Sequence, residues 1–379
     1  MKHLRTAVVV LFVLSSIAAA QQTGKNCNKS SVGLTPLNDL AAGSYKGFQG
    51  GLYPGGDEAV PASHFQAGLA RGASIVPLAK DGSPNLQQGE IVLLTIGMSN
   101  TAIESISLVQ AYSKFPNHNL KVTIVNGAQG GQSAAIIADP NAAYWNDVQG
   151  VLQQNLLTPE QVQVVWLKQS DADPVGQFPL HAQDLAANLE AIVNILHDNF
   201  PNLKQCYVSS RIYGGYSLGS LSPEPYAYES GFSVKWLIQS QIQGKPSLNF
   251  RPNAGPVEAP WLAWGAYMWA DGLVPRSDGL TWECDDFQED GTHPSSVGAG
   301  KVAAFLISEF ADDPTSRPWF VQCEADLDNS GDLNVFDFLS FFNLFSADDP
   351  LSDCDRNMHH DLFDLLCYQN RFASGCSFN

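Results

Sequence analysis

The sequence contains 379 residues, of which 44% are hydrophobic and 15% are charged. This composition is too apolar for a disordered chain and is enough for one large domain and a smaller one. With 20 Lys and Arg against 38 Asp and Glu, the formal net charge is -18, which would repel a phosphate backbone and excludes nucleic-acid binding.

The N-terminus has the residue order of a secretory signal peptide, predicted at residues 1–20. Lys2 and Arg5 precede the apolar run Ala7–Ile17, and three alanines follow it. We therefore expect a mature chain that begins near Gln21 and is secreted, or held at the cell surface through a partner. No later stretch reaches the roughly 20 uncharged apolar residues that cross a bilayer, so no membrane span is expected.

Between residues 88 and 312, short apolar segments alternate with segments of helical periodicity. The predicted strands, rich in Val, Ile, Leu and Tyr, are 90–96, 121–126, 161–168 and 205–212. The predicted helices, with apolar residues spaced by three and four, are 102–113, 142–157, 180–200, 226–243 and 296–310. This alternation predicts an α/β fold with a parallel sheet covered on both faces, whose functional residues follow the strands.

Polar motifs follow the first three predicted strands. Ser99, in Gly97-Met98-Ser99-Asn100, stands at a strand-to-helix turn where a nucleophile is exposed, although serine is also an ordinary helix N-cap there. The glycine-rich stretch 126–133 follows the second strand and directs a backbone N–H towards an oxyanion or only forms a tight bend. Gln169 follows the third strand as a second oxyanion donor or a surface polar group.

A carboxylate and an imidazole stand close together near the end of the α/β region. The motif Asp290-Gly291-Thr292-His293-Pro294 runs directly into the predicted helix 296–310. An aspartate three residues before a histidine can orient the imidazole and stabilise its cationic form while the ring takes the proton of a serine. The alternative interpretation is a helix-entry turn without chemistry.

Four segments of the α/β region, taken in order, resemble the successive blocks of the SGNH, or GDSL-like, hydrolase superfamily. They lie around Ser99, Gly131, Gln169 and the pair Asp290 and His293. The resemblance covers residues 88–312 and implies a flavodoxin-like, three-layer α/β sheet with esterase activity.

The resemblance also implies the role of each residue. Ser99 would be the nucleophile, His293 the general base and Asp290 its orienting carboxylate. The N–H groups of Ser99 and Gly131 would form the oxyanion hole.

The sequence departs from the family pattern twice. Met98 stands where the usual Gly-Asp-Ser has its aspartate, which leaves the serine in place. The third block lacks Gly-x-Asn-Asp, and Gln169 is our substitute for the missing side-chain oxyanion donor.

The charge distribution divides the chain. From Cys323 onward, 11 Asp and Glu stand against two Arg, which is half of the net charge in the last 57 residues. The polar, proline-containing residues 313–322 before it are predicted to be a linker. The hydrolase-like domain is expected at 28–312 and a second domain at 323–376.

Cysteine usage fits an exported protein, in which disulfides persist. Cys27, Cys206 and Cys284 lie in the long part, and Cys323, Cys354, Cys367 and Cys376 lie in the tail. We expect two disulfides within the tail, with the pairing left open by the spacing, and a free buried thiol at Cys206.

The tail contains an internal repeat with an offset of 27 residues, because Asp326–Asp337 matches Asp353–Asp364. Oxygen ligands at loop positions 1, 3, 5, 9 and 12, with a backbone carbonyl at position 7, have the spacing of a calcium loop. The predicted ligands are Asp326, Asp328, Ser330, Asp332, Asn334 and Asp337 in the first loop and Asp353, Asp355, Asn357, His359, Asp361 and Asp364 in the second. Helices are predicted at 338–345 and 365–372; an acidic solvated tail, the alternative, does not explain their aromatic residues.

Residues 323–376 resemble a type I dockerin, a small all-α module with duplicated calcium loops. The resemblance implies structural calcium and a cohesin-like partner protein. Position 6 is Gly331 in the first loop but Met358 in the second, where a positive φ favours glycine, so we expect weaker calcium binding there. Cys323 and Cys376 flank the repeat and are candidates to join its ends.

These inferences predict a secreted serine esterase that removes acyl groups, in the first place acetyl, from an acylated carbohydrate and is tethered through its tail. Catalysis would need no cofactor. A lipid or aryl esterase of the same superfamily and a non-catalytic glycan-binding or surface-assembly protein remain open. Several residues after the later strands are candidates either for sugar contact or for the core: Arg211, Tyr213, Tyr216, Tyr226, Tyr228, Glu229, Trp261, Trp264 and Trp269.

Overall fold

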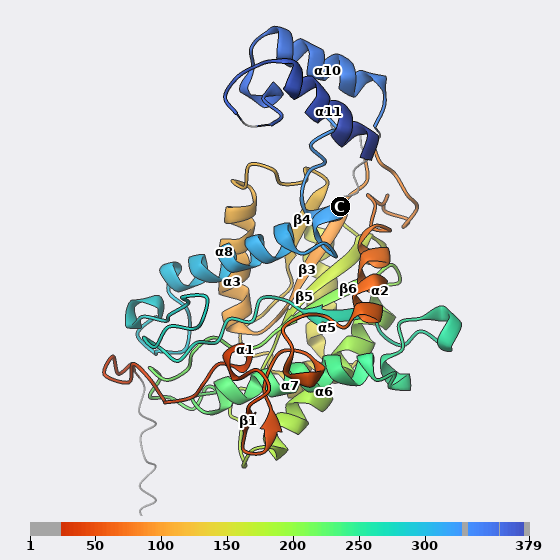
Figure 1. The fold of residues 1–379 in the computed structure, drawn as a ribbon. Coiled ribbons are helices and arrows are strands. Elements are labelled where there is room, and N and C mark those ends of the chain that lie inside the picture. Colours follow the sequence, from red (N-terminus) through yellow and green to blue (C-terminus); the bar gives the residue numbers. More distant parts are fainter. Residues whose placement is uncertain (1–23, 328–332, 356, 375–379) are drawn as a thin grey trace, which may run out of the picture.

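The computed structural model describes residues 24–327, 333–355 and 357–374 (Figure 1). The predicted signal peptide, three predicted ligands of the first calcium loop (Asp328, Ser330 and Asp332) and Cys376 lie outside the described residues. No helix in the described part of the chain combines the length and the apolar character that a transmembrane span needs.

Five parallel strands form the central sheet of a large α/β unit. They are β3 (Ile91–Gly97), β4 (Val122–Asn126), β5 (Val162–Lys168), β6 (Gln205–Ser209) and β7 (Trp261–Trp264). Their order across the sheet is β4-β3-β5-β6-β7, the 2-1-3-4-5 order of flavodoxin-like sheets when numbered along the chain. Every residue of β3 and β5 is buried, which explains why these segments are apolar throughout rather than alternating.

Helices cover both faces of the sheet (Figure 1). They are α2 (Ala62–Gly72), α3 (Ser99–Tyr112), α4 (Ala134–Ile137), α5 (Ala143–Gln154), α6 (Leu180–Asn199), α7 (Tyr226–Ile242), α8 (Ser296–Asp312) and α9 (Arg317–Phe320). Helix α3 packs against α8, and α6 packs against α7, so the sheet is the middle of three layers. The N-terminal segment adds α1 (Leu37–Leu40) and a hairpin of β1 (Ser44–Tyr45) and β2 (Phe48–Gln49).

The four predicted strands and five predicted helices are confirmed, with ends that shift by a few residues. The fourth strand ends at Ser209 rather than at residue 212, and the next residues leave the sheet while staying buried. Strand β7 and helix α2 were not predicted. A four-residue strand buried on both faces has no alternation, so periodicity cannot identify it.

The tryptophans considered for sugar contact belong to the core instead. Trp261, Trp264 and Trp269 are at most 3% exposed. The indole N–H of Trp261 donates to the His64 carbonyl at 3.0 Å, and that of Trp264 donates to the Leu52 carbonyl at 2.8 Å. The same correction applies to the tyrosines of this group that the structure buries, which are Tyr213, Tyr216 and Tyr228.

Residues 313–322, predicted as a linker, are part of the large unit. Trp319 and Phe320 are fully buried in its core. The indole N–H of Trp319 donates to Gln205 Oε1 at 2.8 Å, and Gln205 Nε2 donates to the Thr315 carbonyl at 2.9 Å. The segment is polar overall, but its two aromatic residues are buried in the α/β core, and the backbone N–H of Gln322 donates to the Asn117 carbonyl at 2.9 Å, so the boundary between the units falls after Gln322.

The tail forms a small helical unit with its own core. Helices α10 (Val335–Ser346) and α11 (Leu362–Ser374) enclose Ala325, Phe341, Cys354 and Tyr368. The rings of Phe341 and Tyr368 stack with centroids 4.2 Å apart. This second core is separate from the core of the α/β unit, as the change in charge at Cys323 indicates.

The cysteine pairing agrees with prediction at Cys206, whose thiol is free and buried. Cys354 and Cys367 form a disulfide within the tail. Cys323 is also disulfide-bonded, while its predicted partner Cys376 lies outside the described residues. The disulfide between Cys27 and Cys284 was not predicted, and it ties the N-terminal segment to the loop before α8.

Candidate active site and metal-binding loop

Ser99 is the first residue of α3, and Met98 alone separates it from the end of β3. A Cβ at Gly97 would lie 2.2 Å from the Lys168 carbonyl oxygen, so glycine allows β3 to approach β5 closely. Met98 is extended, with φ -102° and ψ -157°, and it turns the chain into the helix. Because first-turn N–H groups have no acceptor within their helix, the partly exposed Ser99 side chain lies beside free donors and the positive end of α3.

The structure brings the three predicted triad residues together in one hydrogen-bonded row. His293 Nε2 lies 2.8 Å from Ser99 Oγ. On the other side of the ring, His293 Nδ1 makes a short hydrogen bond with Asp290 Oδ2. Both contacts suit a ring that donates from Nδ1 to a carboxylate and accepts the serine proton at Nε2.

The loop that carries this imidazole has a defined shape. Asp290 Oδ1 accepts the backbone N–H groups of Thr292 at 2.9 Å and His293 at 3.0 Å. Gly291 has φ +69°, and a Cβ there would lie 2.8 Å from backbone atoms of Tyr216 and Ser217. Positive φ and lack of space both require glycine between the two candidate catalytic residues.

The N-terminal segment holds the same loop from outside. The Lys25 ammonium donates to the Phe287 carbonyl at 3.0 Å, and Cys27 is bonded to Cys284. Asn100, next to Ser99, donates its side-chain N–H to the Thr292 carbonyl at 3.0 Å. The His293 loop is therefore attached to α3 and to the chain start.

The Asp290 carboxyl is favoured in its ionised form. Partial burial raises its pKa, but hydrogen bonds from the His293 ring and from two backbone N–H groups outweigh burial and hold the pKa below its usual value. With 41% of its side chain exposed, the carboxylate also keeps contact with solvent. An ionised carboxylate at this place can stabilise a cationic imidazole.

The predicted oxyanion donors gather around the glycine-rich turn beside Ser99. A Cβ at Gly130 would lie 3.8 Å from Ser99 Cβ, so the turn lies against the serine. Gly131 is exposed with φ +77°. The buried Gln169 donates its side-chain N–H to the Gln132 carbonyl at 2.8 Å, so its amide holds the shape of this turn. That bond leaves the second amide proton of Gln169 available.

Two buried charges beneath the site were not predicted from the sequence. Glu104, on α3, forms a short hydrogen bond with the Lys168 ammonium at the end of β5, and both side chains are almost fully buried. The Thr101 hydroxyl donates to the Lys168 carbonyl at 2.6 Å. A lysine that closes an otherwise uncharged, buried strand is the signal that indicates such a pair.

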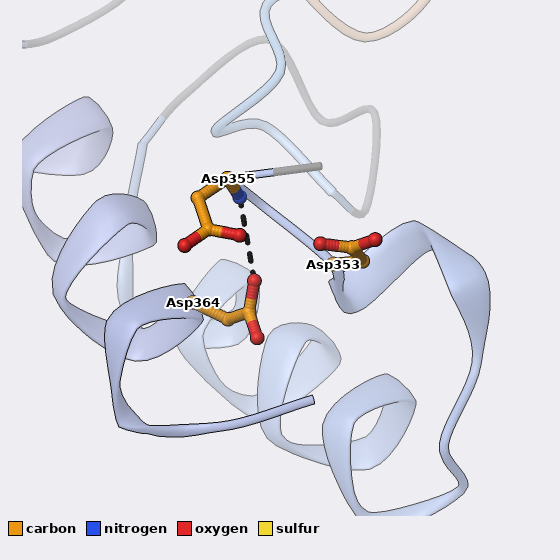
Figure 2. Close-up of side chains that lie close together, drawn as sticks. All are labelled: Asp353, Asp355 and Asp364. Carbon is orange, nitrogen blue, oxygen red and sulfur yellow. Dashed lines mark hydrogen bonds between the residues drawn. The ribbon is translucent and has the colours of Figure 1, made fainter. Parts of the chain in front are cut away.

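Three of the predicted metal ligands converge in the second tail loop. Figure 2 shows Asp353, Asp355 and Asp364, which offer carboxylate oxygens within 4.8 Å of one another. The backbone N–H of Asp355 donates to Asp364 Oδ1 at 3.3 Å, and the N–H of Met358 donates to Asp353 Oδ2 at 2.8 Å. Met358 has φ +65°, so the loop adopts the left-handed turn expected at position 6 without the glycine.

The other predicted ligands of this loop shape the backbone. Asn357 Oδ1 accepts the N–H of His359 at 2.8 Å, and its side-chain N–H donates to Asp355 Oδ2 at 3.0 Å. Asp361 Oδ1 accepts the N–H of Phe363 at 2.8 Å and so begins α11. His359 was expected to contribute only a backbone carbonyl.

The described part of the first loop repeats the same cap. Asn334 Oδ1 accepts the N–H of Phe336 at 2.8 Å, as Asp361 Oδ1 accepts that of Phe363. Asp337 Oδ2 accepts the N–H of Asn334 at 2.8 Å, and Asp364 Oδ2 accepts that of Asp361 at 2.9 Å. The 27-residue sequence repeat is thus a structural repeat at these positions. Asp326, the predicted first ligand, is buried.

No protein-family model matches the chain, and no curated protein matches it. Among solved structures, the chain is similar to the periplasmic domain of a lipopolysaccharide acetyltransferase from Salmonella ser. Paratyphi A. The identity is 12% and the TM-score is 0.33, over 66% of this chain and 95% of that chain.

Proposed function

We propose that the α/β unit is a secreted serine esterase of the SGNH type that hydrolyses short acyl esters, chiefly acetyl esters, on carbohydrate. The observation that carries this proposal is the row Ser99, His293 and Asp290, with contacts on both ring nitrogens of the histidine. A structural histidine needs only one such contact, whereas a nucleophile, a base and an orienting carboxylate need both.

In the proposed reaction, Ser99 Oγ attacks the ester carbonyl carbon while His293 Nε2 takes its proton. The negative oxygen that develops is stabilised by the N–H groups of Ser99 and Gly131 and by the free amide proton of Gln169. The carbon–oxygen bond to the sugar then breaks, and His293 returns the proton to the departing sugar hydroxyl. A water molecule, deprotonated by His293, releases the acid and restores the serine.

The surroundings of Ser99 favour a small acyl group on a large carrier. The Ser99 side chain is partly exposed at the strand-to-helix turn. An acetyl group needs no apolar channel, whereas a fatty acyl chain gains its affinity from one. The exposed turn at Gly130 and Gly131 leaves room for a polymer above the serine.

An active-site serine probe and an ester panel test this proposal. We expect a fluorophosphonate to label the wild-type protein at Ser99, with no labelling in Ser99→Ala. Acetylated glycans are expected to be cleaved with higher kcat/KM than medium-chain acyl or aryl esters. Absence of labelling, together with no turnover of any ester, would indicate a non-catalytic glycan-binding protein.

We propose in addition that the tail is a dockerin-like module that binds calcium and docks on a cohesin-like protein. The second loop supports this, because carboxylates are the ligands that calcium prefers and three of them already converge. Asp353, Asp355 and Asp364 would hold the ion, with Asn357, the His359 carbonyl and Asp361 completing the set. In the first loop the corresponding residues would be Asp326, Asp328, Ser330, Asp332, Asn334 and Asp337. The ion would supply the positive charge that holds these carboxylates together.

The two tail helices support the docking role. Residues at equivalent repeat positions are exposed to a similar degree, at 63 and 65% for Val335 and Leu362 and at 60 and 65% for Phe336 and Phe363. Apolar side chains exposed twice at matching places are costly in water and indicate a protein surface that becomes covered.

Calorimetry of the full-length protein with a panel of cohesin modules tests the docking role. We expect binding in calcium that is lost with chelator and weakened at least tenfold in Phe336→Ala/Phe363→Ala. Leu351→Ala, which removes an exposed apolar side chain outside the matched positions, is the control. Binding that ignores the chelator or the double substitution would contradict the proposal.

A further inference from the structure

The disulfide between Cys354 and Cys367 lies within the second tail loop. Cys354 stands between Asp353 and Asp355, the proposed ligands at positions 1 and 3. Cys367 stands on α11, three residues after Asp364 at position 12. The bonded cysteines are 13 positions apart, so the bond closes a covalent ring that contains positions 3 to 12 of the loop.

One face of α11 contacts the start of this loop at three points. Asp364, Cys367 and Arg371 are spaced by three and four residues, so they project from the same side of the helix. Asp364 Oδ1 accepts the N–H of Asp355 at 3.3 Å (Figure 2). Cys367 is bonded to Cys354, and Arg371 Nη2 donates to the Cys354 carbonyl at 2.8 Å. The disulfide is therefore the covalent part of a contact that holds position 12 against positions 1 to 3.

The bond is part of the tail core. Cys354 is 5% exposed and lies in the same cluster as Phe341 and Tyr368, and the half-buried Cys367 packs against that cluster. A buried covalent contact fixes the start of the loop relative to α11. Breaking the bond would leave only hydrogen bonds to hold the two together.

The three converging carboxylates repel one another when no ion is bound. Oxygens of Asp353, Asp355 and Asp364 lie within 4.8 Å of one another, and like charges at that separation favour an open loop. The disulfide opposes this opening because it keeps the loop start on α11. A ligand set that is already assembled binds its ion more tightly than one that must first be ordered.

The two repeats of the tail differ at this point. The residues 27 positions before the bonded cysteines are Leu327 and Ser340, so the first loop cannot form a corresponding disulfide. The first loop has Gly331 at position 6, whereas the second has Met358 with φ +65°. The loop without the glycine is therefore the one with the disulfide. A covalent ring restricts the unbound loop and so offsets part of the cost of a left-handed Met358.

We propose that the Cys354–Cys367 disulfide sets the calcium affinity of the second loop, so that the oxidation state of this pair controls calcium binding by the tail. The inference rests on the proposed calcium site and concerns its regulation. Since the coupling of two equilibria is reciprocal, calcium stabilises the disulfide by the same factor by which the disulfide strengthens calcium binding.

The reductant of this switch is a dithiol. Its two sulfur atoms form a new disulfide as the bond between Cys354 and Cys367 breaks, and its two protons and two electrons pass to the cysteine sulfurs.

Calorimetric titration of the full-length mature protein with calcium tests the proposal. In an Asp326→Ala background, which removes the first ligand of the first loop, the titration reports the second loop. Cys354→Ser/Cys367→Ser is expected to weaken this binding roughly ten- to a hundredfold, the order expected from opening a ring of about 15 residues. In an Asp353→Ala background, the same double substitution should leave the first loop nearly unchanged.

Cys27→Ser/Cys284→Ser is the matched control, because it removes a disulfide of the α/β unit. It is expected to leave the calcium affinity of both loops unchanged.

A second measurement uses the wild-type protein and does not depend on the folding of a variant. The protein is equilibrated in buffers of reduced and oxidised dithiothreitol, with calcium or with chelator, and the reduced fraction of Cys354 and Cys367 is measured by alkylation and mass spectrometry. Calcium is expected to raise the ratio of disulfide to dithiol by the same factor, roughly ten- to a hundredfold.

The outcomes separate this inference from the proposed site. Equal calcium affinity of the second loop with and without the disulfide, or a reduced fraction that does not respond to calcium, would overturn the inference and leave the calcium site in place. A second loop that binds no calcium in either oxidation state would overturn the proposed site as well.

Discussion

His293 Nε2 lies 2.8 Å from Ser99 Oγ although 194 positions separate the two residues in the chain. The contact exists because α3 and α8 pack side by side and each begins beside its candidate catalytic residue. Ser99 opens α3, and His293 stands just before α8. The two helix starts therefore meet at the same edge of the sheet, where β3 ends.

Ser99→Ala and His293→Ala are each expected to reduce kcat at least roughly 10³-fold while leaving the unfolding temperature nearly unchanged. A nucleophile and its base act as one unit, so loss of either removes most of the effect of both. Ester turnover and thermal unfolding measure this. Ser113→Ala, which removes an exposed hydroxyl at the other end of α3, is the control and should keep full activity. Full turnover by Ser99→Ala would end the serine-esterase assignment.

Gly291→Ala is expected to lower both stability and activity. Its positive φ and the Tyr216 backbone 2.8 Å from the added Cβ together cost roughly 2–4 kcal/mol of unfolding free energy. Gly279 has φ +87° but no atom within 4 Å of its Cβ position, so Gly279→Ala isolates the φ cost of about 1 kcal/mol. Urea unfolding measures the loss of stability in each variant, and ester turnover measures the loss of activity. Equal losses at both glycines would show that crowding beside the catalytic loop has no effect.

Glu309 makes stability depend on pH. Burial, together with the charges of Asp313 and Asp312, raises the pKa of Glu309 to about 7. Because this value lies above that of an unfolded glutamate, about 4.3, the folded state loses stability as pH rises from about 4.5 to 7. Glu309→Gln is therefore expected to raise the unfolding temperature by a few degrees at pH 8 and to leave it unchanged at pH 4.

Glu289→Gln is the control for that experiment, since the Glu289 side chain is 97% exposed. Thermal unfolding of wild type and both variants at the two pH values decides the matter. A stabilisation by Glu309→Gln that is as large at pH 4 as at pH 8 would contradict the titration argument.

Calcium is expected to order the tail. In residues 323–379, 11 carboxylates repel one another and short helices are marginal alone, so helix content should rise on addition of calcium and fall with chelator. Circular dichroism of that segment measures this. A tail equally helical in both conditions would refute a structural role for the ion.

The two calcium loops are expected to differ. Met358→Gly should strengthen the second site about three- to tenfold, because Met358 is held at φ +65°. For the same reason Asp326→Ala is expected to cost more calcium affinity than Asp353→Ala. Calorimetric titration of the full-length variants with calcium gives the comparison, and equal losses at the two aspartates would argue against it.

Patterns of short range were readable from the sequence. Apolar segments near 90–96 and 161–168 predicted strands that are buried throughout, and the periodicity of 180–200 predicted a helix that spans Leu180–Asn199. The order of motifs also placed Ser99 and His293 at the ends of elements that meet. These features depend on residues that are close in the chain. Burial of a strand or of one helix face therefore produces a regular pattern of apolar residues in the sequence.

Features that depend on distant partners were not readable. The polar composition of 313–322 indicated a linker. In the structure, Trp319 is fully buried and its indole N–H donates to Gln205 on β6. From the sequence alone, Trp261 and Trp264 were candidates for sugar contact or for the core. The structure places both in β7, where they are buried. The type of a residue limits the contacts that its side chain can make. Which of these contacts forms depends on the residues that lie next to it in the folded protein.

The sequence by itself determined the α/β class, the position of the candidate triad and the repeat of the tail, because each is a regular spacing of residue types along the chain. The tertiary structure alone decided the contact of His293 with Ser99, the Cys27–Cys284 bond and the buried pair of Glu104 and Lys168. Charges and hydrogen bonds act through short distances in space, and residues such as Glu104 and Lys168 come within that range only when α3 and β5 are packed together.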